Sequence, residues 1–532
     1  MRAQRVLPAA LGASAIVAVV VCALVAMPRV PMGVPGQWVW ERQPLAPLPA
    51  TFGVVASALA GLGAVCLTLR VARTAPLSRW RIGACLGLLV VTSMAFSIAL
   101  LGMEPDPAAV LEGGSLDRLW TRPPFRRAMA SLLTDVRNDV AFGYFGQSLR
   151  VESPVSYLRG YADLIGTGAA PQRVRTHPPG PVLFFWAVRR ALIATGLLDA
   201  PGAWVFGRAE FATAVADVNR MRGPQLGTLD ATAAMVGGLA LLAVGACTVI
   251  PLYLLTRLVA NPGVALSTAG LAAFIPSLIL FVPGIDQSVT FLGVTAVWLF
   301  VLGCRRPSLA LCAGSGVVLF LAGMVTIGAP VLLGAMGLYA VGGVALRWRD
   351  RARRTAAARH ATAALGAAAA GLGLPFLVLK LACGYEPIAV AHTAKAVQAA
   401  IMRDWHRGYA TWLGMNLVDF AVFAGPCLVG IAGSWLILRL RRARRERRLG
   451  RADLLAMAVL ATLLLIDLSG TARGEVGRIW CLLMPYFAIP AALQCVGPAH
   501  GHRNLCIVVV VALAMAQCVT MQSNLDLVKP SW

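Results

Sequence analysis

Carboxylates, tyrosine hydroxyls, arginines and a histidine are concentrated in one polar stretch, residues 134–186. Asp135 and Asp139 are four positions apart in it, so both carboxylates would share one face of a helix, and Tyr144 follows within one or two turns. Paired carboxylates can take a proton from a hydroxyl group or bind a divalent cation. A solvated acidic face of an ordinary helix is the alternative interpretation of this pair.

A His-Pro-Pro-Gly sequence, residues 177–180, redirects the chain within this stretch. Both prolines lack an amide donor and push the residue before them to an extended conformation, so a new helix is predicted to begin at Pro181. Arg173, Arg175 and His177 stand beside this corner and offer positive charge at the membrane surface. An ordinary corner between a loop and a helix would explain the prolines but not these three side chains.

A second polar stretch, residues 469–485, reads SGTARGEVGRIWCLLMP. Arg473, Glu475 and Arg478 precede an apolar segment there, and an arginine at a helix start can hold a phosphate through two parallel hydrogen bonds. The alternative is an internal Arg–Glu pair that closes a tight hairpin, and both interpretations can hold together.

Lys380 and Asp286 are further candidates, because each lies near the end of an apolar segment. The chain has only three lysines, and a charged residue at membrane depth is by default a functional candidate. The alternative for Lys380 is a side chain that simply extends to the aqueous interface.

The elements that must position these residues are membrane-spanning helices. Of the 532 residues, 58% are hydrophobic and only 13% are charged, and the mean hydropathy is +0.74. These values are far from those of soluble domains and indicate an all-α polytopic membrane protein. The net charge of +24 comes from arginines in short loops, which set topology and contact anionic headgroups, so nucleic-acid binding is not expected.

Apolar segments long enough to cross a ~30 Å hydrocarbon core recur along the chain and predict about 13 transmembrane helices. These segments are residues 9–27, 52–69, 82–103, 231–255, 264–282, 288–302, 309–325, 331–346, 362–381, 413–438, 454–468, 479–496 and 505–519. The helix after the His-Pro-Pro-Gly corner is interrupted by Arg189 and Arg190, so we expect it to re-enter the membrane or to lie along its surface.

The basic stretches indicate the orientation of the bundle. Residues 305–306, 347–359 and 439–451 each follow an even number of crossings, so all three share the side of the N-terminus, taken as cytoplasmic. The polar loops then open to the outer face. Three regions follow from this arrangement, and they are N-terminal spans (1–103), an outer-face loop with the candidate active site and a juxtamembrane helix (104–228), and the remaining bundle (229–532).

The cysteines and lysines add two further indications. The 12 cysteines lie mostly in apolar segments and show no Cys-x-x-Cys or Cys/His spacing, so neither a zinc site nor a disulfide framework is predicted. The sequence predicts no definite cofactor. A divalent cation bound by the aspartate pair is the candidate cofactor that these residues could hold. Lysine is nearly absent while Ala, Gly and Arg are abundant, which suggests a GC-rich bacterial genome.

The order of these motifs resembles the GT-C superfamily of integral-membrane glycosyltransferases, as in the protein mannosyltransferase and aminoarabinose transferase group. The motifs are the aspartates with GYF, then THPPGP and a helix, and a late RGEVGRIW, and the resemblance covers roughly residues 134–490. It implies an enzyme of the bacterial cytoplasmic membrane with its active site on the outer face. Such an enzyme moves a sugar from a polyprenyl-phosphate donor to a glycan, lipid or protein acceptor of the cell envelope, with inversion at the anomeric carbon.

The resemblance also implies roles for the candidate residues, since the first outer loop of these enzymes supplies the catalytic aspartate. The predicted catalytic residues are Asp139 and Asp135, the predicted donor-phosphate ligands are Arg478, Arg473, Lys380, His177 and Arg175, and the supporting residues are Glu475, Tyr144 and Asp286. Residues 104–130 depart from the pattern and have no assigned role.

Two other classes of protein remain as alternatives. A transporter or lipid flippase would place polar groups at the bilayer midplane, often in repeated halves, whereas the charged residues here gather at one face and no repeat is visible. A non-catalytic envelope assembly protein with a degenerate site would share all of these sequence features, and activity data alone separate it from an enzyme.

Overall fold

The structure is a computed structural model, and it describes residues 2–74, 77–111, 119–137, 143–220, 225–346, 351–446, 449–496 and 503–527. It confirms the all-α class, because the strands in these ranges are four two-residue segments that form two small antiparallel sheets. The N-terminal elements are α1 (Arg2–Ala26), β1 (Gly33–Val34), β2 (Trp38–Val39), β3 (Glu41–Arg42), α2 (Leu48–Val71) and α3 (Arg79–Leu101).

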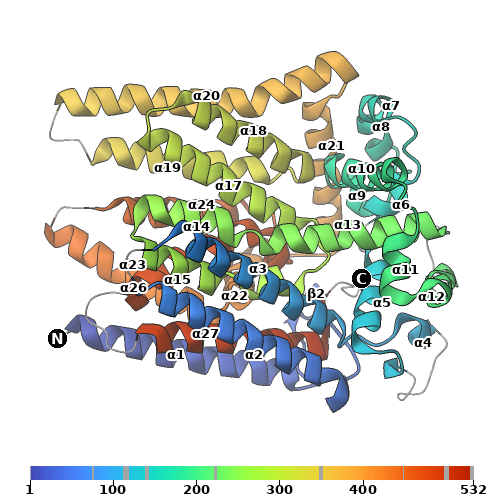
Figure 1. The fold of residues 1–532 in the computed structure, drawn as a ribbon. Helices are drawn as coiled ribbons and strands as arrows, with labels where there is room; N and C mark the ends of the chain where they lie inside the picture. Colours follow the sequence, from blue (N-terminus) through green and yellow to red (C-terminus); the bar gives the residue numbers. More distant parts are fainter. Residues whose placement is uncertain are drawn as a thin grey trace.

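Nine short or medium helices follow between residues 107 and 220, and we call this group the cap. They are α4 (Pro107–Leu111), α5 (Pro124–Arg137), α6 (Tyr144–Ser148), α7 (Pro154–Arg159), α8 (Tyr161–Gly166), α9 (Gln172–Arg175), α10 (Gly180–Thr195), α11 (Ala200–Phe206) and α12 (Arg208–Arg220). The cap gathers at one end of the bundle of long helices (Figure 1).

The rest of the chain completes that bundle. Its first half comprises α13 (Thr228–Ala246), α14 (Val249–Val259), α15 (Pro262–Ala272), α16 (Pro276–Leu280), α17 (Asp286–Arg305), α18 (Leu309–Val325), the 3₁₀ helix η2 (Ala329–Val331), α19 (Leu332–Ala345) and α20 (Arg351–Cys383). Its second half comprises α21 (Pro387–Asp404), α22 (Tyr409–Ala424), α23 (Pro426–Glu446), α24 (Arg451–Ser469), α25 (Val476–Ile479), the 3₁₀ helix η3 (Cys481–Phe487), α26 (Ala488–Val496), α27 (Arg503–Asn524) and β4 (Leu525–Asp526).

The described ranges contain eight helices long and apolar enough to cross a membrane, or up to 10 if two bent pairs each count as one span. The chain therefore has the helices of a multi-pass membrane protein, but the predicted count of about 13 is not confirmed. Several predicted spans are shorter apolar helices of 10–17 residues, such as Pro262–Ala272 and Leu309–Val325.

Two bent pairs account for part of the difference. The predicted span 413–438 is wrong as a single helix, because α22 and α23 meet at an angle of 107°. The break falls at Gly425, which has a φ of 96°, and at Pro426, which cannot continue the hydrogen bonding of α22. The helix after the His-Pro-Pro-Gly corner bends likewise, with 93° between α10 and α11, as in a broken span or a re-entrant loop, so its re-entrant or surface-lying course stays a prediction.

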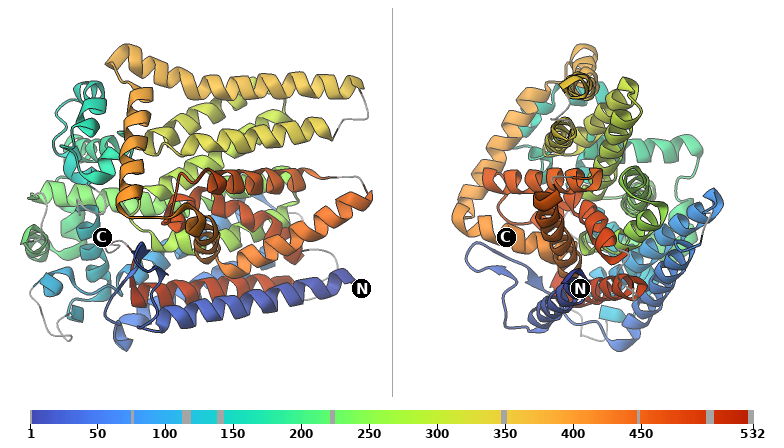
Figure 2. Two further views of the ribbon diagram at one scale, coloured as in Figure 1. Left: turned by 180° about the vertical axis from the view of Figure 1, so that it is seen from behind. Right: turned by 90° about the vertical axis from the view of Figure 1, so that its left-hand side faces the viewer.

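The two ends of the bundle differ in character. The cap and α21, which runs across the helix axes, lie at one end, and the N-terminus lies at the other (Figures 1 and 2). The arginine-rich start of α20 and end of α23 lie with the N-terminus, and we call this the basic end. The predicted separation of polar loops from basic stretches is therefore present, whereas the side of the membrane that each end faces stays a prediction.

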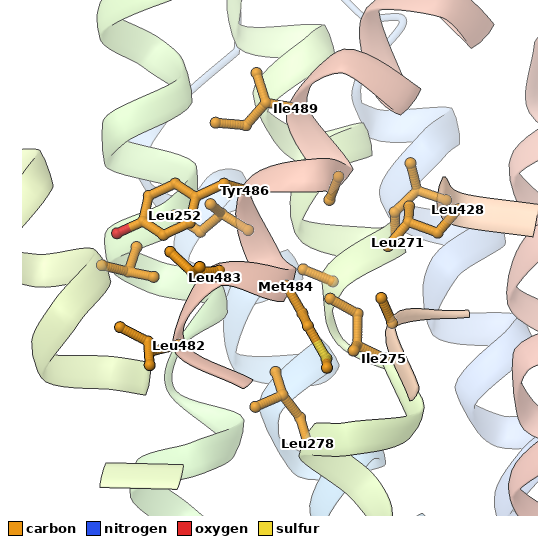
Figure 3. Close-up of a cluster of buried hydrophobic side chains, with 14 of the residues drawn as sticks. Leu252, Leu271, Ile275, Leu278, Leu428, Leu482, Leu483, Met484, Tyr486 and Ile489 are labelled. Atoms are coloured by element: carbon orange, nitrogen blue, oxygen red, sulfur yellow. The ribbon is translucent and has the colours of Figure 1, made fainter. Parts of the chain in front are cut away.

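A buried apolar cluster anchors the segment that carries the second polar motif. Leu483, Met484 and Tyr486 of η3 pack among residues of α14, α15, α16 and α23, with the Tyr486 hydroxyl donating to the carbonyl of Gly293 at 3.2 Å (Figure 3). Close packing of this kind leaves few voids, so the residues of η3 are held rigidly in place. The chain immediately before η3 is therefore held at the cap end of the bundle.

The segment between α1 and α2 is tied to the C-terminal end of the chain. Strands β3 and β4 pair, and Arg42 donates hydrogen bonds to the carbonyls of Val25, Met27 and Val30. The preceding hairpin, β1 with β2, thereby has a fixed place beside the bundle.

Candidate functional site

A cavity of about 510 Å³ opens at the cap end, between the cap, α21 and the polar segment that follows α24. Its lining includes apolar side chains, among them Ile327, Val331, Leu465 and Ile466, and it also includes charged side chains. Among the described residues that line it, five carry a positive charge and two carry a negative charge, namely Arg173, Lys395, Arg407, Arg473 and Arg478 with Asp286 and Glu475.

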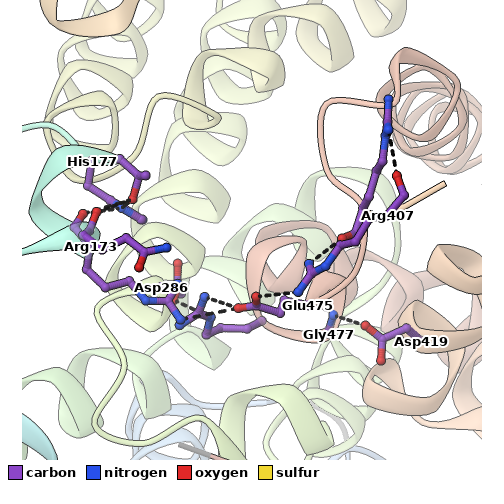
Figure 4. Close-up of polar contacts among 11 residues, drawn as sticks. Arg173, His177, Asp286, Arg407, Asp419, Glu475 and Gly477 are labelled. Atoms are coloured by element: carbon purple, nitrogen blue, oxygen red, sulfur yellow. Dashed lines mark hydrogen bonds and ion pairs between the residues drawn. The ribbon is translucent and has the colours of Figure 1, made fainter. Parts of the chain in front are cut away.

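Three of these arginines meet on one carboxylate, and we call Arg173, Arg407, Arg478 and Glu475 the arginine cluster (Figure 4). Glu475 Oε2 lies 2.7 Å from Arg478 Nη2 and 3.4 Å from Arg173 Nη2, and its Oε1 lies 3.5 Å from Arg407 Nη2. Arg478 also approaches Asp286, with 3.6 Å between Nε and Oδ2. The arginines come from three distant segments of the chain, so tertiary structure alone creates the cluster.

The cluster is nearly closed to solvent, which strengthens its electrostatics. The side chains of Glu475, Arg173 and Arg478 are 8%, 13% and 16% exposed. Burial by itself raises the pKa of the Glu475 carboxyl, but Arg173, Arg478 and Arg407 outweigh that effect and bring it to about 2. Glu475 is therefore ionised throughout the physiological range, and three positive charges surround one negative charge.

Arg407 is held by aromatic rings as well as by Glu475. Its guanidinium carbon lies 4.3 Å from the ring centroid of Trp405, 5.5 Å from that of Trp412 and 5.7 Å from that of Trp38. Cation–π contacts of this kind favour a desolvated guanidinium. Arg407 and Arg473 also donate to each other's backbone carbonyls, at 2.5 and 2.8 Å, which locks the two loops together.

The hairpin between α1 and α2 reaches this locked pair. The side-chain oxygen of Gln37 accepts hydrogen bonds from Trp412 Nε1 at 2.7 Å and from the amide of Gly408 at 3.1 Å. The N-terminal region thus contributes directly to the position of Arg407.

The loop that carries Glu475 requires an unusual backbone. Gly474 has a φ of 88°, and a Cβ atom there would lie 2.9 Å from the ring of Trp412 and 3.0 Å from Arg407 Nη1. Asn416 fixes the loop from α22, since it donates to the carbonyl of Ala472 and accepts from the amide of Gly474, both at 3.0 Å. Asp419, one turn further along α22, accepts from the amide of Gly477 at 3.0 Å.

The His-Pro-Pro-Gly corner is equally well fixed. The hydroxyl of Tyr161 donates to the carbonyls of His177 and Val174, at 2.8 and 3.0 Å. A Cβ atom at Gly180 would come within 2.3 Å of the carbonyl oxygen of Met324, so only glycine allows α10 to approach α18 this closely. The corner therefore presents α9, with Arg173, to the cavity.

His177 lines the cavity, but it is not the cation that the sequence suggests. Burial lowers the pKa of its imidazole to about 4, so the ring is neutral at physiological pH. Its Nδ1 lies 3.0 Å from both the carbonyl oxygen of Arg173 and the hydroxyl of Thr176. The ring packs edge-on against Tyr144, with 5.6 Å between centroids.

The other predicted residues divide into those at the cavity and those elsewhere. Arg473, Arg478, Glu475 and Asp286 line it, and Tyr144 is buried behind His177. Arg175 donates instead to the carbonyl of Ile165 at 3.2 Å, and Lys380 pairs with Glu386 at 3.0 Å on an exposed surface. Neither of these two side chains lines the cavity.

The predicted catalytic aspartates are placed only in part. Asp135 is buried in α5, with 3% of its surface exposed, and does not line the cavity. Asp139 lies outside the described residues, five positions before Tyr144. Among the described residues, no group of three or more His, Cys, Asp or Glu side chains could hold a metal ion. A divalent cation at the aspartate pair therefore stays a prediction.

Several residues that line the cavity or support its loops had no strong sequence signal. Lys395 and Arg407 lie in a stretch whose tryptophan and tyrosine residues suggest only an interfacial aromatic belt. Asn416 and Gln37 are single polar residues in or near apolar segments. A polar residue inside an apolar helix was the available signal for Asn416, because such groups are costly in a membrane unless they are satisfied.

The arrangement can bind an anion next to an apolar surface. Arginine has five N–H donors, and within the described ranges Arg478 uses Nη2 for Glu475 and directs Nε toward Asp286, so Nη1 remains for a ligand. A phosphate at this edge would meet fixed guanidinium groups that need no rearrangement. The apolar side chains of the lining would accommodate a hydrocarbon chain attached to that phosphate.

No protein-family model and no curated protein sequence matches this chain. The fold is weakly similar to two solved structures of the Archaeoglobus fulgidus oligosaccharyltransferase. The complex with Zn and sulfate gives 14% identity and a TM-score of 0.38, and covers 74% of this chain and 52% of the other. The form tethered to an acceptor peptide gives 12% identity and a TM-score of 0.33, and covers 74% of this chain and 54% of the other. The chain thus matches about half the length of that protein.

Proposed function

We propose that this protein is a GT-C-type glycosyltransferase that moves a sugar from a polyprenyl-phosphate donor to an acceptor of the bacterial cell envelope. The observation that carries the proposal is the arginine cluster in a cavity whose lining also includes many apolar side chains. A polyprenyl-phosphate sugar has the same division into an anion and a hydrocarbon chain. The sequence motifs that resemble the GT-C superfamily support the same assignment.

In this proposal the arginine cluster binds the donor phosphate and stabilises it as the leaving group. Arg173 and Arg478 contact the phosphate, while Glu475 and Asp286 hold their guanidinium groups in place. Charge-assisted hydrogen bonds from fixed donors are worth more in a closed site, where water does not compete. The developing negative charge on the phosphate therefore meets donors that are already aligned.

The chemical step is a direct displacement at the anomeric carbon. The acceptor hydroxyl oxygen forms a bond to that carbon, the bond between the carbon and the phosphate oxygen breaks, and the phosphate leaves with the electron pair. A carboxylate takes the hydroxyl proton, and Asp139 or Asp135 is proposed for this role because the resemblance to the GT-C superfamily assigns the catalytic aspartate to the first outer loop. Attack opposite the leaving group inverts the anomeric configuration.

The cap end faces the outside of the cytoplasmic membrane in this proposal. The support is that the arginine-rich termini of α20 and α23 lie at the opposite end, as the positive-inside rule requires of a cytoplasmic side. The regions 1–103, 104–228 and 229–532 act as N-terminal spans, catalytic cap and supporting bundle, and the first also supplies Gln37 to the site.

The test is to incubate the purified protein with a panel of polyprenyl-phosphate sugars and to measure release of polyprenyl phosphate. We expect release with at least one donor, and a ten- to hundredfold loss in Arg173→Lys, because the loss of one charge-assisted contact costs about 1.5–3 kcal/mol. Arg175→Lys is the matched control, since Arg175 is two residues away but donates to a backbone carbonyl outside the cavity.

Two results would contradict the proposal. Equal activity of the two lysine variants would remove the phosphate from the arginine cluster. Donor binding without release, together with movement of the lipid between leaflets, would favour a flippase. Orientation is tested separately, because a cysteine introduced at Thr471 should react with an impermeant reagent in intact cells and one at Arg444 should not.

A further inference from the structure

A second cavity, of about 580 Å³, lies at the basic end of the bundle. It is formed where the turn after α2, the turn between α14 and α15, and the facing ends of α26 and α27 come together. Its volume is within the range of small-molecule sites. It shares no lining residue with the cavity at the cap end.

Two arginines from different helices line this second cavity. Arg73 follows the end of α2, and Arg257 lies in the last turn of α14. In the described part of the chain, neither guanidinium has an ion pair with a carboxylate, and no aspartate or glutamate lines the cavity. The neighbouring segments 75–76 and 497–502, which lie outside the described residues, contain no acidic residue either. Within the part of the chain that the structure describes, no carboxylate therefore neutralises the positive charge of this cavity.

The remaining lining divides into polar and apolar parts. Asn261 caps α15 by accepting a hydrogen bond from the amide of Val264 through Oδ1 at 2.9 Å. This contact does not use the side-chain NH₂ group, which can therefore donate to a ligand. Thr74 and Asn504 add further polar groups, while the apolar part is formed by Leu69, Leu77, Ile82 and Val496. Cationic and amide donors beside leucines match a phosphate that is joined to acyl chains.

We propose that this second cavity binds the phosphate of an anionic phospholipid headgroup. The supporting electrostatics extend beyond the cavity, since the same end carries the arginine-rich termini of α20 and α23 and no cap. Basic pockets between membrane helices on the cytoplasmic side are suited to acidic headgroups. The lipid would join the first spans to α14 and α27, and the proposal does not depend on the glycosyltransferase assignment.

The test uses the full-length protein, purified and stripped of lipid, with binding followed by native mass spectrometry. Phosphatidylglycerol should bind, whereas phosphatidylcholine and inorganic phosphate at the same concentration should bind far less. The double variant Arg73→Gln/Arg257→Gln should bind phosphatidylglycerol about thirtyfold more weakly, which corresponds to about 2 kcal/mol for two arginines.

The matched control is Arg441→Gln/Arg444→Gln, which removes two exposed arginines at the same end that do not line the cavity. This control should bind phosphatidylglycerol as the unmodified protein does. Equal weakening in both double variants would assign the effect to general surface charge and would overturn the site. Binding of inorganic phosphate as tight as that of the lipid would overturn the lipid as the ligand.

Discussion

Both ends of the bundle are rich in arginine, but they place it in opposite ways. At the cap end Arg173, Arg407 and Arg478 come from segments far apart in sequence, are at most 16% exposed, and share the carboxylate of Glu475. At the basic end many arginines stand in runs of sequence neighbours, and Arg442, paired with Glu446, is 62% exposed.

The difference follows from what it costs to remove charge from water. Buried guanidinium groups need a partner within reach, or the penalty of desolvation is not offset. Exposed arginines remain hydrated, so they can be numerous and consecutive, and each ion pair among them is worth little. The exposed arginines can thus be predicted from their runs in the sequence, whereas the buried and paired arginines are brought together only by the fold.

The largest effect, a loss of sugar-transfer rate, is expected for Asp139→Asn. If Asp139 is the base, its amide keeps the shape but cannot accept the proton, and the transfer rate should fall by about 10²–10⁴ while donor binding persists. Asp135→Asn should cost far less, because Asp135 does not line the cavity. The measurement is sugar transfer by each purified variant.

The control lies at the other end of the bundle. Asp453 accepts hydrogen bonds from Arg439 at 2.9 and 2.6 Å and from the amide of Gly450, so Asp453→Asn should lower thermal stability and leave the rate per folded molecule unchanged. Near-normal transfer by the double variant of Asp135 and Asp139 would remove the proposed base and leave an ordinary acidic helix in its place.

Much of the fold could be predicted from the sequence, because long apolar segments have one stable form in a membrane. The all-α class and the separation of polar loops from basic stretches follow from that rule. The predicted count of about 13 spans is not confirmed, and one predicted span contains a helix break. Gly425 and Pro426 stand together inside the predicted span 413–438, and that pair is a strong turn signal.

The predicted site residues that line the cavity come mainly from one compact motif. Arg473, Glu475 and Arg478 are within six positions of each other and line the cavity. Arg173 contacts Glu475 across 302 residues, and Arg407 does so across 68, so no local pattern contains either contact. Arg175 and Lys380 had equally good sequence signals, and they bind a backbone carbonyl and a surface glutamate instead.

Removal of the shared carboxylate tests how strongly the buried arginines at the cap end depend on it. Glu475→Gln leaves the three arginines without a counter-charge in a closed site, and loss of one partner of a buried ion pair costs about 3–5 kcal/mol. The exposed counterpart is Glu446→Gln, which should cost less than about 1 kcal/mol. Thermal unfolding of both variants in detergent gives the difference.

The pH dependence of the same pair gives an independent check. The arginines lower the pKa of Glu475 from 4.5 to about 2, so its stabilisation is fully present above pH 4.5 and is lost as the pH falls toward 2. The contribution is roughly 3 kcal/mol. Unmodified protein should therefore lose more stability than Glu475→Gln over this interval, and parallel acid curves would contradict the strong ion pairing.

A smaller effect is expected from Gly474→Ala, which tests whether the backbone of the loop holds the arginine cluster together. Alanine at a φ of 88° is strained by about 1–3 kcal/mol, and its Cβ would also press on Trp412. Gly433→Ala in α23 is the control, because a Cβ there meets nothing within 4 Å and a helical alanine is favoured by about 0.5–1 kcal/mol. The two variants should shift thermal stability in opposite directions, and equal shifts would show that the loop backbone is not special.

The smallest effect concerns Gln37, which lies in the N-terminal region and touches the cluster only through its neighbours. Gln37→Ala removes the acceptor for Trp412 Nε1 and for the amide of Gly408, and each lost hydrogen bond is worth about 0.5–1.5 kcal/mol. Because Trp412 and the loop at Gly408 hold Arg407, we expect a few-fold higher KM for the donor with a nearly unchanged kcat, whereas a variant that was merely less stable would keep its KM. Gln37→Glu provides the conservative test, since a carboxylate can still accept both hydrogen bonds and should restore the KM. If neither variant changes the KM, the hairpin between α1 and α2 is only attached to the bundle, and the cap end positions its arginines without help from the first span.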